Sequence, residues 1–243
     1  MILVLQSRVL FIAGPGAVPV MSSIRSHAFV FVAVFGTVLA SGAAARRARD
    51  GTHVAAASNQ GTAVTDWREG LSGGISSGPA EANAQMIVFS DYQCPACRML
   101  HRSLERVLGA DSATVRVVTH QLPLEKLHPR ARAAARSALC AARQGRFREM
   151  ERLLYDSQEF LPTADLDSLA GRIGLPRLAA FQGCMRDPEI DDEIDRDVAL
   201  ATRFGLFVTP SFIIAGRRYA GAFPDSVLAA LLRISRTNPS PVQ

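Results

Sequence analysis

Cys94 and Cys97, separated by Pro95 and Ala96, are the side chains of this sequence best suited to chemistry. They lie between an apolar run at 85–90 and a stretch of helical periodicity, so we expect the pair at the first turn of a helix. Unpaired N–H groups and the helix dipole stabilise an anion at that position, and a thiolate is such an anion. Cys94 is therefore predicted to be the nucleophile. Cys97, one turn deeper on nearly the same face, is predicted to attack the mixed disulfide that Cys94 forms.

Other uses of such a pair are a zinc site, a covalently attached haem and a structural disulfide. A zinc site needs a second C-x-x-C or a His pair at suitable spacing, and none follows. Haem attachment needs His directly after the second cysteine, where this sequence has Arg98. A short-loop structural disulfide stays open, because a helix N-terminus lowers a thiol pKa whether or not function uses it. We therefore expect no metal and no other cofactor, with the cysteines carrying the electrons.

Hydrophobic periodicity predicts the elements that position this pair. A buried strand, an amphipathic helix and a second strand form a βαβ unit, whose parallel strands require a right-handed crossover. A helical block broken by Gly and Pro comes next, then two strands and a helix, so the fold class is α/β with an insertion of four or five helices. The predicted strands are 85–90, 114–119, 211–214 and 217–220. The predicted helices after the first are 130–144, 147–157, 166–173, 176–186, 189–204 and 224–234.

The N-terminal segment 1–45 has the pattern of a targeting sequence. Met21 offers a second start, followed by the basic Arg25, an apolar stretch at 28–40 and small residues up to Ala45, which is the order found in a secretory signal peptide. We expect translation to begin at Met21 and cleavage to fall near Ala45. An uncleaved membrane anchor is the alternative, although the basic residues that follow would then lie on the wrong side of the membrane.

The rest of the chain divides into a tether, one folded domain and a tail. Residues 46–83 are rich in Ala, Ser, Gly and Thr and are predicted to be a flexible tether, in which Trp67 is a surface aromatic without an assigned function. The domain is placed at 84–235, with its helical insertion at about 124–204 and a disordered tail at 236–243. The 243 residues carry a formal net charge of +5 without a polybasic tract, so no nucleic-acid partner is expected.

The cysteine segment resembles that of a known family, the DsbA-like thioredoxin-fold thiol–disulfide oxidoreductases. The matching run after the first strand is Asp91-Tyr92-Gln93-Cys94-Pro95-Ala96-Cys97. Other segments fit the same family in the same order, and the resemblance spans roughly residues 78–232. These segments are Gly78-Pro79, Cys140-Ala141-Ala142-Arg143-Gln144-Gly145, Phe204-Gly205-Leu206, Thr209-Pro210-Ser211-Phe212-Ile213-Ile214 and Gly216.

The resemblance implies roles for Thr209 and Pro210. Pro210 would be a cis proline lying against Cys94, and Thr209 would offer its backbone to an extended substrate segment. A trans proline that starts an edge strand is the alternative. Two departures from the family stand out. Val208 replaces the Gly of many relatives, and the residues between the cysteines lack the His of strongly oxidising members, which argues against extreme oxidising power.

The function implied by the resemblance is that of an exported thiol–disulfide oxidoreductase, located outside the cytoplasm in the periplasm or secreted. It would introduce disulfides into exported cysteine-containing proteins and be reoxidised by a membrane partner of the DsbB or vitamin K epoxide reductase type. A reductase or isomerase of the same fold is one alternative. A non-catalytic adaptor that binds extended peptides at the Thr209-Pro210 groove is another.

Several further side chains are secondary candidates. Asp91 could transfer protons during resolution or could serve only as a turn residue. Cys140 and Cys184 are predicted to form a structural disulfide, because an even cysteine count in an exported protein favours pairing. Free buried thiols and a redox relay are the alternatives for that pair. His101 is interpreted as a solvated or packed side chain. A solvated helix face is the interpretation for Arg98, Arg102 and Arg106.

Overall fold

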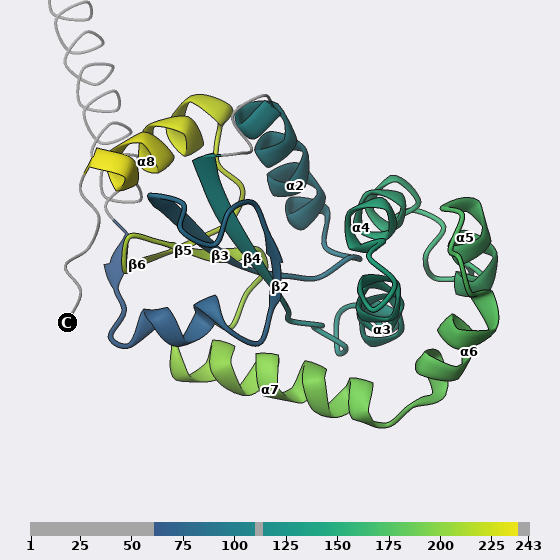
Figure 1. The fold of residues 1–243 in the computed structure, drawn as a ribbon. Helices are drawn as coiled ribbons and strands as arrows, with labels where there is room; N and C mark the ends of the chain where they lie inside the picture. Colours follow the sequence, from purple (N-terminus) through teal and green to yellow (C-terminus); the bar gives the residue numbers. More distant parts are fainter. Residues whose placement is uncertain (1–60, 110–113, 238–243) are drawn as a thin grey trace, which may run out of the picture. The chain divides into compact units, whose positions relative to one another are not determined.

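A mixed sheet of six strands is the centre of the structure, a computed structural model that describes residues 61–109 and 114–237 (Figure 1). Within the described residues the strand order is β1-β6-β5-β3-β4-β2. Strand β3 runs parallel to β4 and antiparallel to β5, and β5 and β6 form an antiparallel hairpin. The strands are β1 (Thr62–Ala63), β2 (Ile75–Ser77), β3 (Ala84–Ser90), β4 (Val115–Gln121), β5 (Ser211–Ile214) and β6 (Arg217–Ala220).

Helices cover both faces of this sheet (Figure 1). Because side chains alternate along a strand, Met86 and Val88 of β3 pack with helices α2 and α8, whereas Ile87 and Phe89 pack with α7 and the short helix η1. Strand β3 is therefore apolar on both faces, which explains the unbroken apolar run in the sequence. The bounds are η1 (Trp67–Leu71), α2 (Pro95–Leu108), α7 (Glu189–Arg203) and α8 (Asp225–Thr237).

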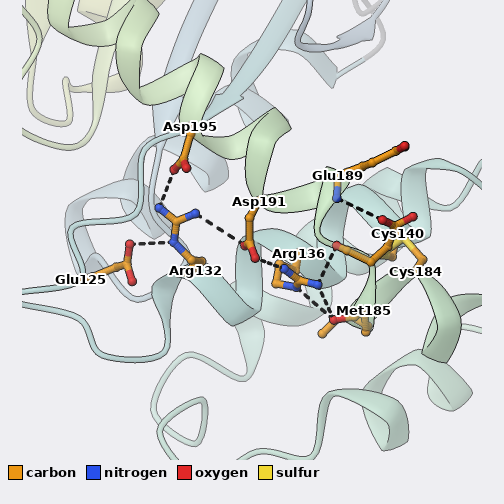
Figure 2. Close-up of polar contacts among 10 residues, drawn as sticks. Glu125, Arg132, Arg136, Cys140, Cys184, Met185, Glu189, Asp191 and Asp195 are labelled. Atoms are coloured by element: carbon orange, nitrogen blue, oxygen red, sulfur yellow. Dashed lines mark hydrogen bonds and ion pairs between the residues drawn. A yellow bond between two sulfur atoms is a disulfide. The ribbon is translucent and has the colours of Figure 1, made fainter.

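The helical insertion lies between β4 and α7 and has a hydrophobic core of its own, which also contains Cys94 and Cys97. A disulfide between Cys140 and Cys184 joins helix α3 to α6. Arg136 of α3 donates hydrogen bonds to the carbonyl of Met185, at 3.0 and 2.6 Å, and pairs with a carboxylate of α7 (Figure 2). The insertion helices are α3 (Ala131–Ala142), α4 (Phe147–Asp156), α5 (Leu166–Arg172) and α6 (Leu178–Arg186).

The predicted fold class is confirmed, and the predicted helices and strands agree with the structure to within about two residues at most ends. The predicted tether, however, is wrong for residues 61–83. These residues form β1, η1 and β2, and Trp67 is buried against the sheet rather than on the surface. The composition of this segment predicts flexibility, but burial of the Trp67 ring and pairing of the short strands with β6 and β4 give it an ordered structure.

Parts of the predicted organisation lie outside the described residues. The signal peptide or anchor at 1–45 and the tether residues 46–60 belong to that part, as does most of the predicted tail. Helix α8 continues to Thr237, so residues 236 and 237, which were predicted to belong to the tail, are helical. Within 61–109 and 114–237, no helix is both long and apolar enough to cross a membrane.

Candidate active site

The cysteine pair lies where strand β3 gives way to helix α2, as the sequence predicts. Cys94 is the N-cap of α2 and Pro95 is its first residue, a position that needs no backbone N–H partner. The N–H of Cys97 donates to the Cys94 carbonyl at 3.1 Å, which closes the first turn. Both cysteines are free thiols, with Cys94 8% and Cys97 1% exposed. The structure therefore represents the dithiol form, with Cys94 nearer the surface.

The pKa of the Cys94 thiol is lowered to about 5. The largest cause is a hydrogen bond from the Cys97 thiol, which favours the Cys94 thiolate. Burial opposes this effect, while Thr209 and the backbone N–H groups of Cys97 and Ala96 add to it. These backbone groups are unpaired because they belong to the first turn of α2. Cys94 is therefore a thiolate near neutral pH.

The pKa of Cys97 is raised, mainly because burial penalises its thiolate. Its hydrogen bond to Cys94 and the negative charge there raise the pKa further. The backbone N–H of Asp91, 3.4 Å from the Cys97 sulfur, acts in the opposite direction. Cys94 thus ionises first and Cys97 keeps its proton, which fits the predicted role of Cys94 as the nucleophile.

The loop that faces Cys94 contains the Thr209–Pro210 peptide bond, which is cis as the family resemblance implies. The Cys94 sulfur lies 3.3 Å from the carbonyl oxygen of Thr209, so the two segments are in direct contact although they are far apart in sequence. Phe207 and Val208, directly before them, are 68% and 54% exposed. Two exposed apolar side chains therefore directly precede the residue that contacts the reactive sulfur.

Arg218 of β6 holds the start of this loop. Its Nη1 donates to the carbonyls of Phe204 and Gly205, at 2.8 and 2.7 Å, where α7 ends. Gly205 has a φ of +66°, and a Cβ at that position would collide with the Arg218 guanidinium. Glycine is required here for both reasons. The chain can then turn from α7 toward Pro210.

Asp91 is fully buried, and its carboxylate organises the loop before Cys94. The carboxylate accepts hydrogen bonds from the N–H of Gln93 at 2.8 Å, the N–H of Leu124 at 2.9 Å and His128 Nδ1 at 2.8 Å. The structure therefore shows a turn role for the Asp91 side chain. No local pattern pointed to His128, which lies in the segment after β4.

Gln158, from the segment after α4, also holds the cysteine loop. Its buried Nε2 donates to the carbonyls of Tyr92 and Cys94, at 2.8 and 2.9 Å. Gln93 in turn accepts from the N–H of Arg130 at 2.6 Å. The helical insertion thus fixes the backbone on which the reactive thiol sits. Sequence reasoning missed Gln158, because the contact joins residues 64 positions apart.

The remaining candidates are placed as follows. Cys140 and Cys184 are joined to each other, apart from the Cys94–Cys97 pair. His101 is packed against the Tyr155 ring, with 4.8 Å between ring centroids. Within the described residues, no cluster of three or more Cys, His, Asp or Glu side chains is arranged to hold a metal ion. The helix-face arginines pair with acids of other segments, in the pairs Arg98–Glu159, Arg102–Asp156 and Arg106–Asp225.

This arrangement of fold and thiols agrees with the comparisons with known proteins. The thioredoxin family model matches residues 71–233, and the chain belongs to that family. A solved structure, a thioredoxin-like oxidoreductase from Silicibacter pomeroyi, is 26% identical with a TM-score of 0.58, covering 70% of this chain and 98% of that one. Alpha-DsbA1 from Wolbachia pipientis is 21% identical with a TM-score of 0.58, covering 67% and 90%, and at this identity it supports the fold alone.

Among curated proteins, the matches include parts of larger transport proteins. The Na(+)/H(+) antiporter NhaA 3 of Salinispora tropica is 36% identical over 153 residues, which are 63% of this chain and 23% of the antiporter. The NhaA 1 antiporter of Salinispora arenicola is 35% identical over the same shares. The chain thus spans about a quarter of these relatives' length. Their transport activity is not carried over to this chain.

Proposed function

We propose that this protein is an exported thiol–disulfide oxidoreductase that introduces disulfides into other exported proteins through Cys94 and Cys97. The observation that carries the proposal is the opposite direction of the two pKa shifts, with Cys94 lowered to about 5 and Cys97 raised. A stabilised Cys94 thiolate stabilises the reduced enzyme, and a stable reduced form is what makes a dithiol protein an oxidant. The lowered pKa therefore favours the oxidase direction.

The reaction begins with the disulfide form of the enzyme. A substrate thiolate attacks the Cys94 sulfur, the Cys94–Cys97 bond breaks, and its electron pair goes to Cys97, which takes up a proton. A second substrate thiolate attacks the substrate sulfur of the mixed disulfide, and Cys94 leaves as a thiolate. The substrate loses two electrons, which the cysteine pair retains. Cys94 is the better leaving group of the pair because its pKa is low.

The Thr209 backbone and the exposed Phe207 and Val208 side chains are proposed to hold an extended substrate segment beside Cys94. Reduced Cys94 and Cys97 would be reoxidised by a membrane partner of the DsbB or vitamin K epoxide reductase type. A location outside the cytoplasm is proposed on two grounds, the signal-like segment and the Cys140–Cys184 disulfide, a kind of bond that persists in oxidising compartments. A Salmonella enterica structural relative is also described as periplasmic.

The test combines oxidative refolding of a reduced, cysteine-containing protein with reduction of insulin. Wild-type protein is expected to accelerate refolding, and Cys94→Ser is expected to lose this activity because no mixed disulfide can form. A Cys94→Ser variant that keeps both activities would overturn the proposal.

Two alternatives are separated by direct measurements. A measured reduction potential near that of thioredoxin, about −270 mV, would favour a reductase or isomerase over an oxidase. A non-catalytic adaptor would bind extended peptides while its Cys94 thiol titrates near the ordinary value of about 8.5. A Cys94 titration well below that value would exclude the adaptor.

A further inference from the structure

We propose that Glu151 of helix α4 exchanges the proton that Cys97 must gain or lose, across a cavity behind the cysteine pair. This inference deepens the proposed thiol–disulfide exchange and rests on it. Cys97 is only 1% exposed, so little of its surface is in contact with bulk solvent. A nearby group that can hold a proton is therefore needed each time the Cys97 sulfur changes its charge.

The cavity has a volume of about 240 Å³, and Cys97 and Glu151 both line it. Its wall combines apolar side chains, among them Leu100 and Val88, with polar and charged side chains of α2, α4 and the sheet. A space of this size with polar partners has room for water, which can carry a proton between two groups that are not in contact.

Polar side chains line this cavity together with Cys97 and Glu151. Ser90 and Tyr155 share a hydrogen bond of 2.6 Å between their hydroxyl groups, and Ser90 acts to lower the pKa of the Cys97 thiol. His101 Nδ1 lies 3.8 Å from Glu151 Oε2, and the His101 ring packs on Tyr155. Ser90, Tyr155 and His101 thus line the same cavity as the buried thiol and the carboxyl.

Glu151 is suited to proton exchange because its side chain is only 15% exposed. Burial raises its pKa to about 8, Arg148 opposes the shift, and the charge of Glu105 adds to it. Burial also lowers the pKa of His101, so the histidine is neutral where Glu151 titrates. The charged and titratable groups that line the cavity are Cys97, His101 and Glu105 of α2 and Arg148, Glu151, Arg152 and Tyr155 of α4.

The step is balanced in both directions. When a substrate thiolate breaks the Cys94–Cys97 bond, the electron pair goes to Cys97 and the Glu151 carboxyl gives it a proton, becoming a carboxylate that is reprotonated from solvent. In reverse, the Cys97 thiol gives its proton to the Glu151 carboxylate, and its sulfur attacks the mixed disulfide. The same group serves both directions because the transition state is shared.

The experiment isolates the Cys97 step with an aromatic disulfide, dithiobis-nitrobenzoate, added to the reduced full-length protein. Cys94 attacks first and releases one coloured nitrothiolate, and Cys97 then displaces the second and closes the Cys94–Cys97 bond. In wild type, the rate of the second release is expected to rise with pH and to level off above about pH 8, where Glu151 is ionised. In Glu151→Gln the rate at pH 8 is expected to fall at least about tenfold and to keep rising with pH, because only hydroxide removes the proton.

Glu149→Gln is the matched control, because Glu149 lies on the same helix, pairs with Arg146 and is absent from the cavity lining. Its second release should follow the wild-type profile, whereas the first release should be unchanged in both variants. An unaltered second release in folded Glu151→Gln would overturn the proposal for Glu151. A wild-type protein that releases no second nitrothiolate would instead overturn the proposed exchange itself.

If Glu151→Gln does not fold, the same experiment is done with Glu151→Asp. Aspartate keeps the carboxyl but withdraws it by one methylene, so the profile should still level off while its plateau rate falls. A plateau and midpoint identical to those of wild type would show that the position of the carboxyl does not matter, and would overturn the proposal.

Discussion

The largest cause of the low pKa of Cys94 is one neighbour, the thiol of Cys97, with smaller contributions from Thr209 and the first turn of α2. Proximity of the cysteines was predictable, because a two-residue spacer at a helix start places both side chains on one face. The burial of Cys97 was not, because it depends on the insertion helices that pack over it. The difference in pKa between the two thiols therefore depends on tertiary packing and not on local sequence alone.

The first prediction concerns this dependence. Replacement Cys97→Ala is expected to raise the pKa of Cys94 by at least about one unit toward its ordinary value of about 8.5, because the largest stabilising hydrogen bond is lost. The pH dependence of Cys94 alkylation by iodoacetamide measures this change. Cys140→Ala/Cys184→Ala serves as the control, since these residues do not contact the Cys94 sulfur in any described hydrogen bond. An inflection that stays near pH 5 in Cys97→Ala would contradict the assignment.

At the scale of elements, local periodicity predicted the helices and the central strands, because each has a face or a full side that is apolar. Strands β1 and β2 were missed because they span only two and three residues and are formed by pairing with β6 and β4. The contacts of Gln158 and Glu151 were missed for a similar reason. Glu151 and Tyr155 do lie one helical turn apart, beside the buried Met150 and Leu154, and this spacing is the one sequence signal that could have indicated a buried carboxyl.

The second prediction concerns the link between α3 and α6. The Cys140–Cys184 bond closes a loop with a sequence separation of 44 residues. Removing it by Cys140→Ala/Cys184→Ala is expected to lower the free energy of unfolding by about 4 kcal/mol, because the unfolded chain gains conformational freedom. Urea denaturation measures the loss. The polar contacts of Arg136 remain in the variant (Figure 2), so the insertion should still fold, and a loss below about 1 kcal/mol would contradict the expectation.

At the scale of the whole molecule, the redox state of the cysteine pair should govern how stability depends on pH. Cys94 has a folded-state pKa near 5, below its unfolded value of about 8.5. The stability it contributes to the dithiol form is thus fully present above about pH 8.5 and is lost as the pH falls to 5. The pKa of Glu151 is raised rather than lowered. Because Glu151 titrates in both redox forms, its effect on stability largely cancels when the dithiol and disulfide forms are compared.

The third prediction follows from this balance. The quantity of interest is the free energy of unfolding of the dithiol form minus that of the disulfide form. We expect this difference to increase by about 2–4 kcal/mol between pH 5 and pH 8. Guanidinium denaturation of both forms at several pH values gives this difference. Cys94→Ala, which has one redox form only, should lack the gain in stability between pH 5 and 8. A difference between the two wild-type forms that does not change with pH would show that the Cys94 thiolate is not stabilised by folding.

Strands β1 and β2 form the two outer edges of the sheet. Both precede β3 in the chain, yet they pair with the outer sides of β6 and β4 and so occupy the hydrogen-bonding groups of two longer strands. A chain shortened to begin at residue 84, where periodicity alone places the domain, would leave those groups unpaired. We expect such a chain to self-associate through the seven-residue β4, detectable by light scattering, while a chain beginning at residue 61 stays monodisperse. Residues 61–83, whose composition is typical of a linker, would then prevent neighbouring copies of the protein from pairing their sheets.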